Sequence, residues 1–396
     1  MIGEQVRRYR NERGLSLAQL AKLSKLSKGF LSKVENGQSS LDERRSLLNV
    51  ADALGVAPHQ LTGQPYDPQT RQEDTVHAAV LDIRDVLHGN TVGERYTDPS
   101  DDLESVRRTT ARVVALHDDC ALHQYGPILA DLLGDLYAFA ADLDGGVRAE
   151  SLPMLVTALN ATRDLAHWAG EPDLAYLAAD QAVLAARTAE DPPLVGYATF
   201  GLVHSLGHVD GKHARTRAAT VAELGADELQ APAAGGGPTA EMYGMLHLVS
   251  AWSAQVAGDG QRADEHLHEA DDVTRLTGEG TAHRLWFGPN NAAAWRLAIA
   301  VDRGGGDVPA LARAVEPRLL PSRERRAGHW INVGRGMALD PATAAHAIPA
   351  FKKARRLAPL RTRANPFVHA VTERLVWEVS GSEVIEFARW LGVIAR

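Results

Sequence analysis

The sequence is poor in cysteine, in aromatic residues and in long apolar runs. Its 396 residues include one cysteine, Cys120, which can neither close an intramolecular disulfide nor form a thiolate cluster for zinc. No apolar run approaches the length of about 18 residues that a membrane span needs, and the first residues lack the charged and then apolar pattern of a signal peptide. These absences indicate a reducing compartment, and we expect a cytoplasmic protein without membrane contact.

The motifs of common enzyme classes are also absent from the sequence. It contains no Gly-x-Ser-x-Gly, and the glycine runs 235–237 and 304–306 follow no predicted strand, as a phosphate-binding loop would. His204 and His208 have the spacing of two metal ligands on one helix, but no cysteine and no suitably placed glutamate accompanies them. We therefore predict no catalytic residues, no metal site and no cofactor.

Charge is distributed unevenly along a chain of otherwise ordinary globular composition. The length of 396 residues exceeds what a single core usually supports and predicts two or more domains. Residues 1–63 hold ten Lys or Arg against six Asp or Glu, a net charge of +4, whereas the remaining residues carry −12. A small basic module beside a large acidic body indicates a phosphate-binding domain attached to a body that repels DNA.

Runs of helix-breaking residues divide the chain. Residues 62–68 are rich in glycine, proline and aspartate and set the first boundary, whereas residues 76–87 have the apolar spacing of a helix. Residues 89–102 form a second polar, turn-rich stretch. The predicted parts are a first domain over 1–63, a linker with a lead-in helix over 64–102, and a larger domain over 103–396.

The larger domain reads as a series of helical hairpins. From about residue 103 the chain consists of Ala-rich and Leu-rich segments of 14 to 18 residues, without the alternation of apolar and polar residues that strands need. Three similar breaks contain Gly170, Gly211 and Gly258, spaced by 41 and 47 residues, which is close to the length of a helix-hairpin repeat. Small residues follow each break at packing spacing. We predict that each break ends one helix and begins another.

Two short helices with a tight turn between them are predicted near the N-terminus. Ser16 and Gln19 form a capping box that begins the first helix. Ser27 begins the second helix, and Asn36 with Gly37 ends it.

The two short helices separate apolar from basic side chains. Their inward residues and the expected apolar neighbours on flanking helices are Leu20, Ala21, Leu31, Val34, Val6, Tyr9, Leu47, Leu48, Ala51 and Leu54. The outer face of the second short helix presents Lys28, Gly29, Ser32 and Lys33. This face is typical of a helix that enters the DNA major groove.

With these features the sequence resembles the Cro/CI-type, or XRE, helix-turn-helix family, most plainly in segments 31–37 and 51–56. The resemblance covers about residues 3–62 and implies a lambda-repressor-like domain of five helices, with the third helix in the major groove. It also implies an ion pair between Arg10 and Glu35. Two departures are Lys25, where the family usually has a turn glycine, and Leu17, which replaces a common polar phosphate contact. The first implies left-handed backbone strain of roughly 1 kcal/mol.

The resemblance also implies which residues bind DNA. Carried over by position, Lys28, Gly29, Ser32 and Lys33 face the bases, and lysine favours guanine O6 and N7. The remaining DNA-binding residues, near the sugar-phosphate backbone or at the start of the second short helix, are Ser16, Leu17, Ser27, Phe30, Asn36 and Gln38. A helical domain that binds protein instead is the alternative, but such a helix would show apolar anchors at these positions.

Segments 287–291 and 325–335 resemble a group of actinobacterial XRE regulators with tetratricopeptide-like C-terminal domains. Stacked hairpins create a concave surface, and asparagines on that surface bind a peptide backbone in related peptide-responsive regulators. The resemblance therefore makes Asn290, Asn291 and Trp295 candidate ligand-binding residues. Alternatively, Asn291 caps a helix and Trp295 belongs to the core.

We expect an all-α protein in which a five-helix lambda-repressor-like DNA-binding domain precedes an α-solenoid of tetratricopeptide-like helical hairpins. The leading hypothesis is a transcriptional regulator that binds a double-stranded DNA operator as a homodimer. Its repeat domain would dimerise and sense a peptide or small-molecule effector. The alternatives are an adaptor that holds a protein partner on its repeats, with secondary DNA binding, and an enzyme hidden in the helical body.

Overall fold

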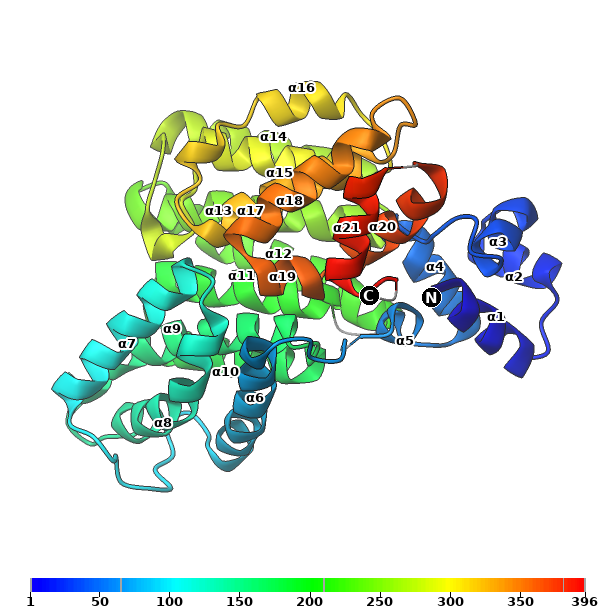
Figure 1. Cartoon of the computed structure of the whole chain (residues 1–396). Helices are drawn as coiled ribbons and strands as arrows, with labels where there is room; N and C mark the ends of the chain where they lie inside the picture. The colour runs from blue at the N-terminus through cyan, green and yellow to red at the C-terminus, as the bar shows by residue number, and fades with distance from the viewer. Residues whose placement is uncertain (1, 65, 209–210, 380, 395–396) are drawn as a thin grey trace.

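The computed structural model describes residues 2–64, 66–208, 211–379 and 381–394. Every regular element in these ranges is a helix, which confirms the predicted all-α fold. In Figure 1 a small group of N-terminal helices lies beside a larger body of packed helices. None of the described helices has the length and apolar character needed to cross a membrane.

Five short helices form the N-terminal domain. They are α1 (Ile2–Glu12), α2 (Leu17–Ser24), α3 (Lys28–Glu35), α4 (Arg44–Leu54) and α5 (Pro58–Thr62). Val6, Leu20, Leu31, Val34 and Leu54 are fully buried in one core, as their inward positions predicted. Each such side chain contributes roughly 1.5 to 3 kcal/mol by leaving water.

The body is built mainly from antiparallel helical hairpins. Its helices are α6 (Arg71–Gly89), α7 (Leu103–Asp118), α8 (Leu122–Ala140), α9 (Gly145–Trp168), α10 (Pro172–Thr188), α11 (Pro192–His208), α12 (Lys212–Ala233), α13 (Gly237–Ala257), α14 (Gly260–Thr277), η1 (Ala282–Arg284), α15 (Pro289–Asp302), α16 (Val308–Arg313), η2 (Pro317–Leu319), α17 (Arg323–Met337), η3 (Ala344–His346), α18 (Ala347–Leu357), α19 (Pro359–Ala364), α20 (Pro366–Glu378) and α21 (Ser382–Leu391). Helices α9, α11, α13, α15 and α17 pack against one another in succession, and each also packs against the helix that follows it. This is the arrangement of a helical solenoid.

The three predicted breaks are the turns inside three of these hairpins. Gly170 separates α9 from α10, Gly211 precedes α12, and Gly258 separates α13 from α14. All three adopt positive φ angles of 82°, 108° and 93° respectively, which glycine adopts without steric cost. The prediction that each break ends one helix and begins another is confirmed, although Val209 and Asp210 lie outside the described residues.

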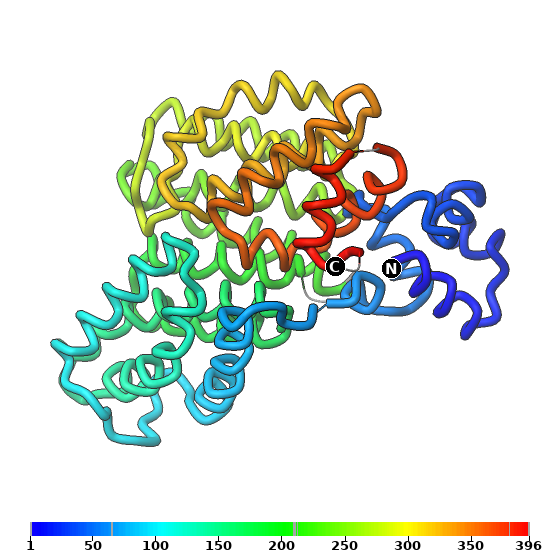
Figure 2. The backbone as a smooth tube through the Cα atoms, viewed as in Figure 1, coloured from blue at the N-terminus to red at the C-terminus, as the bar shows by residue number. Residues whose placement is uncertain are grey.

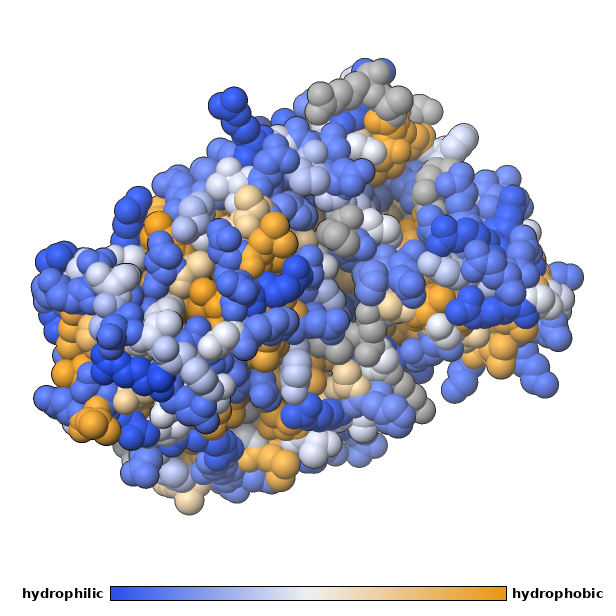
Figure 3. All heavy atoms as spheres, turned by 90° about the horizontal axis from the view of Figure 1, so that it is seen from below, coloured by the Kyte–Doolittle hydropathy of each residue, from blue (hydrophilic) through white to orange (hydrophobic). Residues whose placement is uncertain are grey.

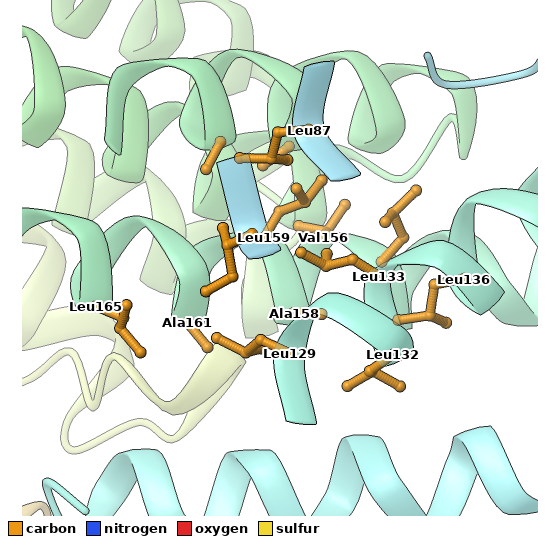
Figure 4. Close-up of a cluster of buried hydrophobic side chains, with 14 of the residues drawn as sticks. Leu87, Leu129, Leu132, Leu133, Leu136, Val156, Ala158, Leu159, Ala161 and Leu165 are labelled. Atoms are coloured by element: carbon orange, nitrogen blue, oxygen red, sulfur yellow. The ribbon is translucent and has the colours of Figure 1, made fainter. Parts of the chain in front are cut away.

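The largest core of the body lies among its first helices. Figure 4 shows part of it, with Leu87 of α6 nearest to Val156 and Leu159 of α9, and with Leu129 and Leu133 of α8 in the same cluster. Helix α6, the predicted lead-in helix, buries its whole apolar face here, including Ile83. Helix α6 is therefore packed against the body. On the face seen in Figure 3, most of the surface is hydrophilic and hydrophobic residues are scattered in small groups.

The chain returns to the N-terminal domain at its C-terminal end. Figure 2 traces it from the N-terminal helices to α6 and α8, back through the hairpins, and finally to α20 and α21 beside α4. Phe367 and Ala370 of α20 join the core of the N-terminal domain. Ion pairs Arg215–Asp52, at 2.6 Å, and Arg374–Asp42, at 2.8 Å, also cross the interface. The N-terminal domain is thus docked on the body.

Candidate DNA-recognition site

Side-chain caps fix where α2 and α3 begin. The Ser16 hydroxyl accepts a hydrogen bond from the Gln19 backbone N–H at 3.2 Å, and the Ser16 N–H donates to the Gln19 side chain at 2.8 Å. Ser27 caps α3 by accepting from the N–H of Phe30 at 3.1 Å. Each cap satisfies amide groups that have no partner within their own helix. The predicted starts at Ser16 and Ser27 are therefore confirmed.

The turn between α2 and α3 has the left-handed geometry expected at Lys25. Its φ is 58° and its ψ is 29°, and its backbone N–H donates to the carbonyl of Ala21. The N–H of Leu26 donates to the same carbonyl at 3.1 Å. These two hydrogen bonds hold Lys25 in a conformation that glycine adopts more easily.

The rear of α3 is held by a buried ion pair and a close helix crossing. Arg10 of α1 donates from Nε and Nη2 to the two carboxylate oxygens of Glu35, at 2.5 and 2.8 Å, which confirms the pair that the family resemblance implied. The bond to Glu35 raises the pKa of Arg10. Gly3 of α1 lies directly against the backbone of Val34, where a Cβ atom would overlap the Val34 carbonyl. Helix α3 is therefore fixed rigidly from behind.

The front of α3 is open to solvent. Lys28, Gly29 and Lys33 are exposed and Ser32 is half-buried, so the four residues expected to face bases form one accessible surface. A Cβ atom added at Gly29 would meet no other atom within 4 Å. In the part of the chain that the structure describes, no hydrogen bond or ion pair joins residues 16–38 to the body. The body therefore leaves this surface uncovered.

The other expected DNA-binding residues differ in their exposure to solvent. Ser16, Ser27, Asn36 and Gln38 are exposed. Leu17 and Phe30 are half-buried and pack against the domain core, so each also has a structural role.

Arg7 is a further basic residue at the site, which our sequence reading missed. It is exposed on α1, and its Nη2 donates to Oδ1 of Asn36 at 2.5 Å. The signal in the sequence was the cluster of arginines in residues 7–10, but only the crossing of α1 and α3 brings Arg7 to the end of the recognition helix.

The predicted ligand residues lie apart from α3, at the start of α15. Asn290 exchanges two hydrogen bonds with the backbone of Glu316, at 2.8 and 3.1 Å. Asn291 donates to the carbonyls of Leu285 and Trp286, at 3.0 and 3.1 Å, and it is not a helix cap because Gly288 occupies that position. Asn291 and Trp295 border a cavity between the body and the N-terminal domain, whereas Asn290 does not.

Comparisons with known proteins agree with the geometry of the N-terminal domain. The helix-turn-helix domain family matches residues 2–62. The HTH-type transcriptional regulator SinR of Bacillus subtilis (strain 168) is 30% identical over 69 residues, which are 17% of this chain and 62% of that protein. The SinR of Bacillus licheniformis is 32% identical over 77 residues, 18% of this chain and 69% of that protein. No solved structure matches the chain.

The family match covers the N-terminal domain, where the buried scaffold and the exposed face of α3 were found. The chain spans somewhat less than two thirds of the length of the first of these relatives. The 32% identity to the SinR of Bacillus licheniformis, over 69% of that protein, shows that the chain belongs to the XRE-type family of helix-turn-helix transcriptional regulators.

Proposed function

We propose that this protein is a sequence-specific transcriptional regulator that reads an operator through α3. Lys28 and Lys33 donate to guanine O6 and N7 in the major groove, and Ser16, Ser27 and Asn36 contact the backbone. The observation that carries the proposal is the exposed basic face of α3. It lies on a domain that is docked on the body through other elements.

The proposal includes a homodimer. One domain of this size reads only a half-site, so two must be held about 34 Å apart to bind one operator. The acidic body, with its net charge of −12, is unsuited to binding DNA and is the natural site of dimerisation and of effector sensing.

The domain organisation belongs to the same proposal. Residues 1–63 act as the DNA-binding unit, residues 64–102 connect it to the body, and residues 103–396 form the helical unit. The apolar core of the N-terminal domain, which Phe367 and Ala370 of α20 join, supports the first boundary, whereas α6 of the connecting segment shares the core of the first hairpins.

The test is selection of binding sites from random double-stranded DNA by the full-length protein. Each of Lys28→Ala and Lys33→Ala should cost about 1 to 3 kcal/mol of binding free energy and relax selection at one base position. The matched control is Arg112→Ala with Arg313→Ala, which removes two exposed charges from the body. Sedimentation of the protein with the selected site measures whether two chains bind.

Two results would contradict the proposal. Selection that the Lys28→Ala, Lys33→Ala double variant retains in full would show that α3 does not read the bases. If the wild-type protein selects no sequence and a stable protein partner is found on the repeats, the alternative function is favoured, namely an adaptor that holds a protein partner.

A further inference from the structure

A cavity of about 410 Å³ lies where the body meets the N-terminal domain. Its floor is formed by the succession α9, α11, α13, α15 and α17, and its other side by Arg44, Leu47 and Leu48 of α4 with residues of α5. Cavities of roughly 300 to 1,000 Å³ are typical of small-molecule sites. The size and the position between two domains suit a small ligand.

One wall of the cavity consists of flat aromatic rings. Trp295 lies 5.6 Å from His204, and His204 stacks on Trp252 with ring centroids 5.1 Å apart. His208 is 5.6 Å from the same tryptophan and 4.3 Å from His167. His204 stacks on Trp252 with 25° between the ring planes, and Trp295 is tilted by 52° to His204, so a ligand ring can make stacked and edge contacts here.

The histidines of this wall are uncharged at neutral pH. Burial lowers the pKa of His204 to about 3 and that of His167 to about 4. Burial also lowers the pKa of His208 well below its ordinary value. No group of three or more metal-ligating residues occurs in the described ranges. The wall therefore resembles an apolar surface rather than a cation or metal site.

Helix α17, next to α15 in the same floor, carries one arginine without a carboxylate partner. Arg325 of α17 donates from Nη1 to Oδ1 of Asn291 at 3.0 Å and lies 5.9 Å from the ring centroid of Trp286. Within the described ranges no carboxylate lies within ion-pair distance of Arg325. Burial lowers the pKa of Arg325, although the negative charge of Glu324 acts to raise it. A buried charge without a paired charge is costly, so a ligand anion at Arg325 would be favourable.

The other arginines around the cavity already have carboxylate partners. These pairs are Arg44 and Arg335 with Asp302, Arg163 with Asp164, Arg284 with Asp118, and Arg361 with Glu324. The Nε atoms of Arg163, Arg335 and Arg361 are buried and have no acceptor in the described part of the chain. Six arginines against four carboxylates leave an excess of two positive charges, one at Arg325 and one shared by Arg44 and Arg335 around Asp302. Arg325 is the cavity arginine that shares no carboxylate, and the two oxygens of one carboxylate suit its guanidinium.

We propose that this cavity binds a small aromatic carboxylate, whose carboxylate pairs with Arg325 and whose ring lies against Trp295, His204 and Trp252. Arg44 and Leu48 of the DNA-binding domain line the same cavity, so the ligand also fixes how that domain sits on the body. This consequence for DNA binding rests on the proposed function. The binding site itself does not.

The test uses calorimetric titration of the full-length protein, without DNA, by indole-3-acetate and 2-naphthoate. The primary amide of each acid is the matched neutral probe. At least one acid should bind tenfold or more tightly than its amide. The substitution Arg325→Gln should abolish that preference, whereas Arg325→Lys, which keeps the charge, should retain most of it. Trp295→Leu should weaken acid and amide alike.

The control variant is Arg326→Gln, because Arg326 is the next residue of α17 and does not line the cavity. It should bind both probes as the wild type does, and thermal unfolding checks that every variant is folded. Equal affinity for acid and amide, an acid preference that survives in Arg325→Gln, or no binding of either acid at millimolar concentration would overturn the proposal. Operator affinity is measured separately, because a protein that binds its operator but neither acid would contradict the ligand site and leave the proposed DNA-binding function intact.

Discussion

Lys25 shows how a single backbone position constrains the recognition helix. The residue lies between α2 and α3 with a left-handed φ of 58°. A side chain with a Cβ atom costs about 1 kcal/mol in this region, whereas glycine adopts it freely. Capping and the surrounding core hold Lys25 there, so the strain is retained in the folded domain.

Replacing Lys25 by glycine should therefore stabilise the turn. We expect Lys25→Gly to raise the free energy of local opening of α2 and α3 by about 1 kcal/mol. The control Lys22→Gly lies inside α2 and should lower that free energy by about 1 kcal/mol, because glycine is a poor helix former. Hydrogen exchange of the full-length protein measures both. A Lys25→Gly variant that exchanges as fast as Lys22→Gly would rule out strain at the turn.

Gly29 and Gly3 provide a second comparison at the residue scale. A Cβ atom at Gly29 would point into open space on the reading face, whereas one at Gly3 would collide with the backbone of Val34. Gly29→Ala should leave the domain folded and weaken operator binding at least tenfold, because its methyl group lies where the bases approach. Gly3→Ala should instead destabilise the domain.

Operator affinity and hydrogen exchange together separate the effects of the two glycine variants. Unchanged operator binding by a folded Gly29→Ala variant would show that this part of α3 does not approach DNA closely. A Gly3→Ala variant with wild-type exchange rates would show that α1 can move away from α3 without cost.

Helix α4 joins the two domains because its two faces have different partners. Leu47, Val50 and Leu54 pack in the core of the N-terminal domain, whereas Arg44 points to the body. Leu48 was predicted to face the same core, but this prediction was wrong: it does not belong to that core and lines the cavity between the domains, on the side of α4 that faces the body.

A buried charge cluster connects α4 to the body. Arg44 and Arg335 share the carboxylate of Asp302, at 3.2 and 2.6 Å, and both Asp302 and Arg335 are nearly inaccessible to solvent. Burial alone would raise the pKa of Asp302, but Arg335 and Arg44 lower it below its ordinary value, so the carboxylate stays ionised. Two arginines would be left unpaired if this one charge were removed.

Asp302→Asn should therefore loosen the docking of the N-terminal domain. Breaking a buried pair of this kind costs about 3 to 5 kcal/mol. We expect a larger radius of gyration in small-angle scattering and a lower melting temperature. The control Asp272→Asn removes a carboxylate from an exposed pair with Arg275, which is worth about 0 to 1 kcal/mol. An Asp302→Asn protein as compact and stable as this control would contradict the role of the cluster.

At the scale of the whole molecule, buried histidines at the cavity make the free energy of unfolding depend on pH. The pKa of His167 is lowered to about 4 and that of His204 to about 3, chiefly by burial. In the unfolded chain both would take up protons near pH 6.5. Acid therefore favours the unfolded state, because the unfolded chain binds protons that the native protein does not.

We expect stability to fall as the pH drops from about 6.5 towards 4, on the order of 1 kcal/mol per pH unit for each such histidine. Urea unfolding at pH 7.5 and pH 5.5 measures the change. A His167→Asn, His204→Asn double variant should lose less stability than the wild type over this interval. Equal losses in the two proteins would show that these histidines do not cause the dependence.

Much of the structure followed from short-range patterns. Ser16, Ser27 and Gly37 mark helix ends through hydrogen bonds and backbone angles that depend only on residues a few positions away, so they were predictable. The same holds for Gly170, Gly211 and Gly258 between the helices of the hairpins, and for the exposed basic face of α3. Helix periodicity arises from contacts three and four residues apart, and the sequence therefore determined that the chain is helical and most inward faces of the N-terminal domain. The predicted segments of 14 to 18 residues were too short for α9, α12 and α13, which have 24, 22 and 21 residues.

The tertiary structure alone decided how the two domains meet. Arg44 and Asp302 are 258 positions apart, and no local pattern indicates that they form a pair. The same docking placed Leu48 at a cavity, and the succession of inner helices brought His204, Trp252 and Trp295 together. Such contacts depend on the complementarity of surfaces that form only after the helices have packed, whereas each helix records in its sequence only which of its faces is apolar.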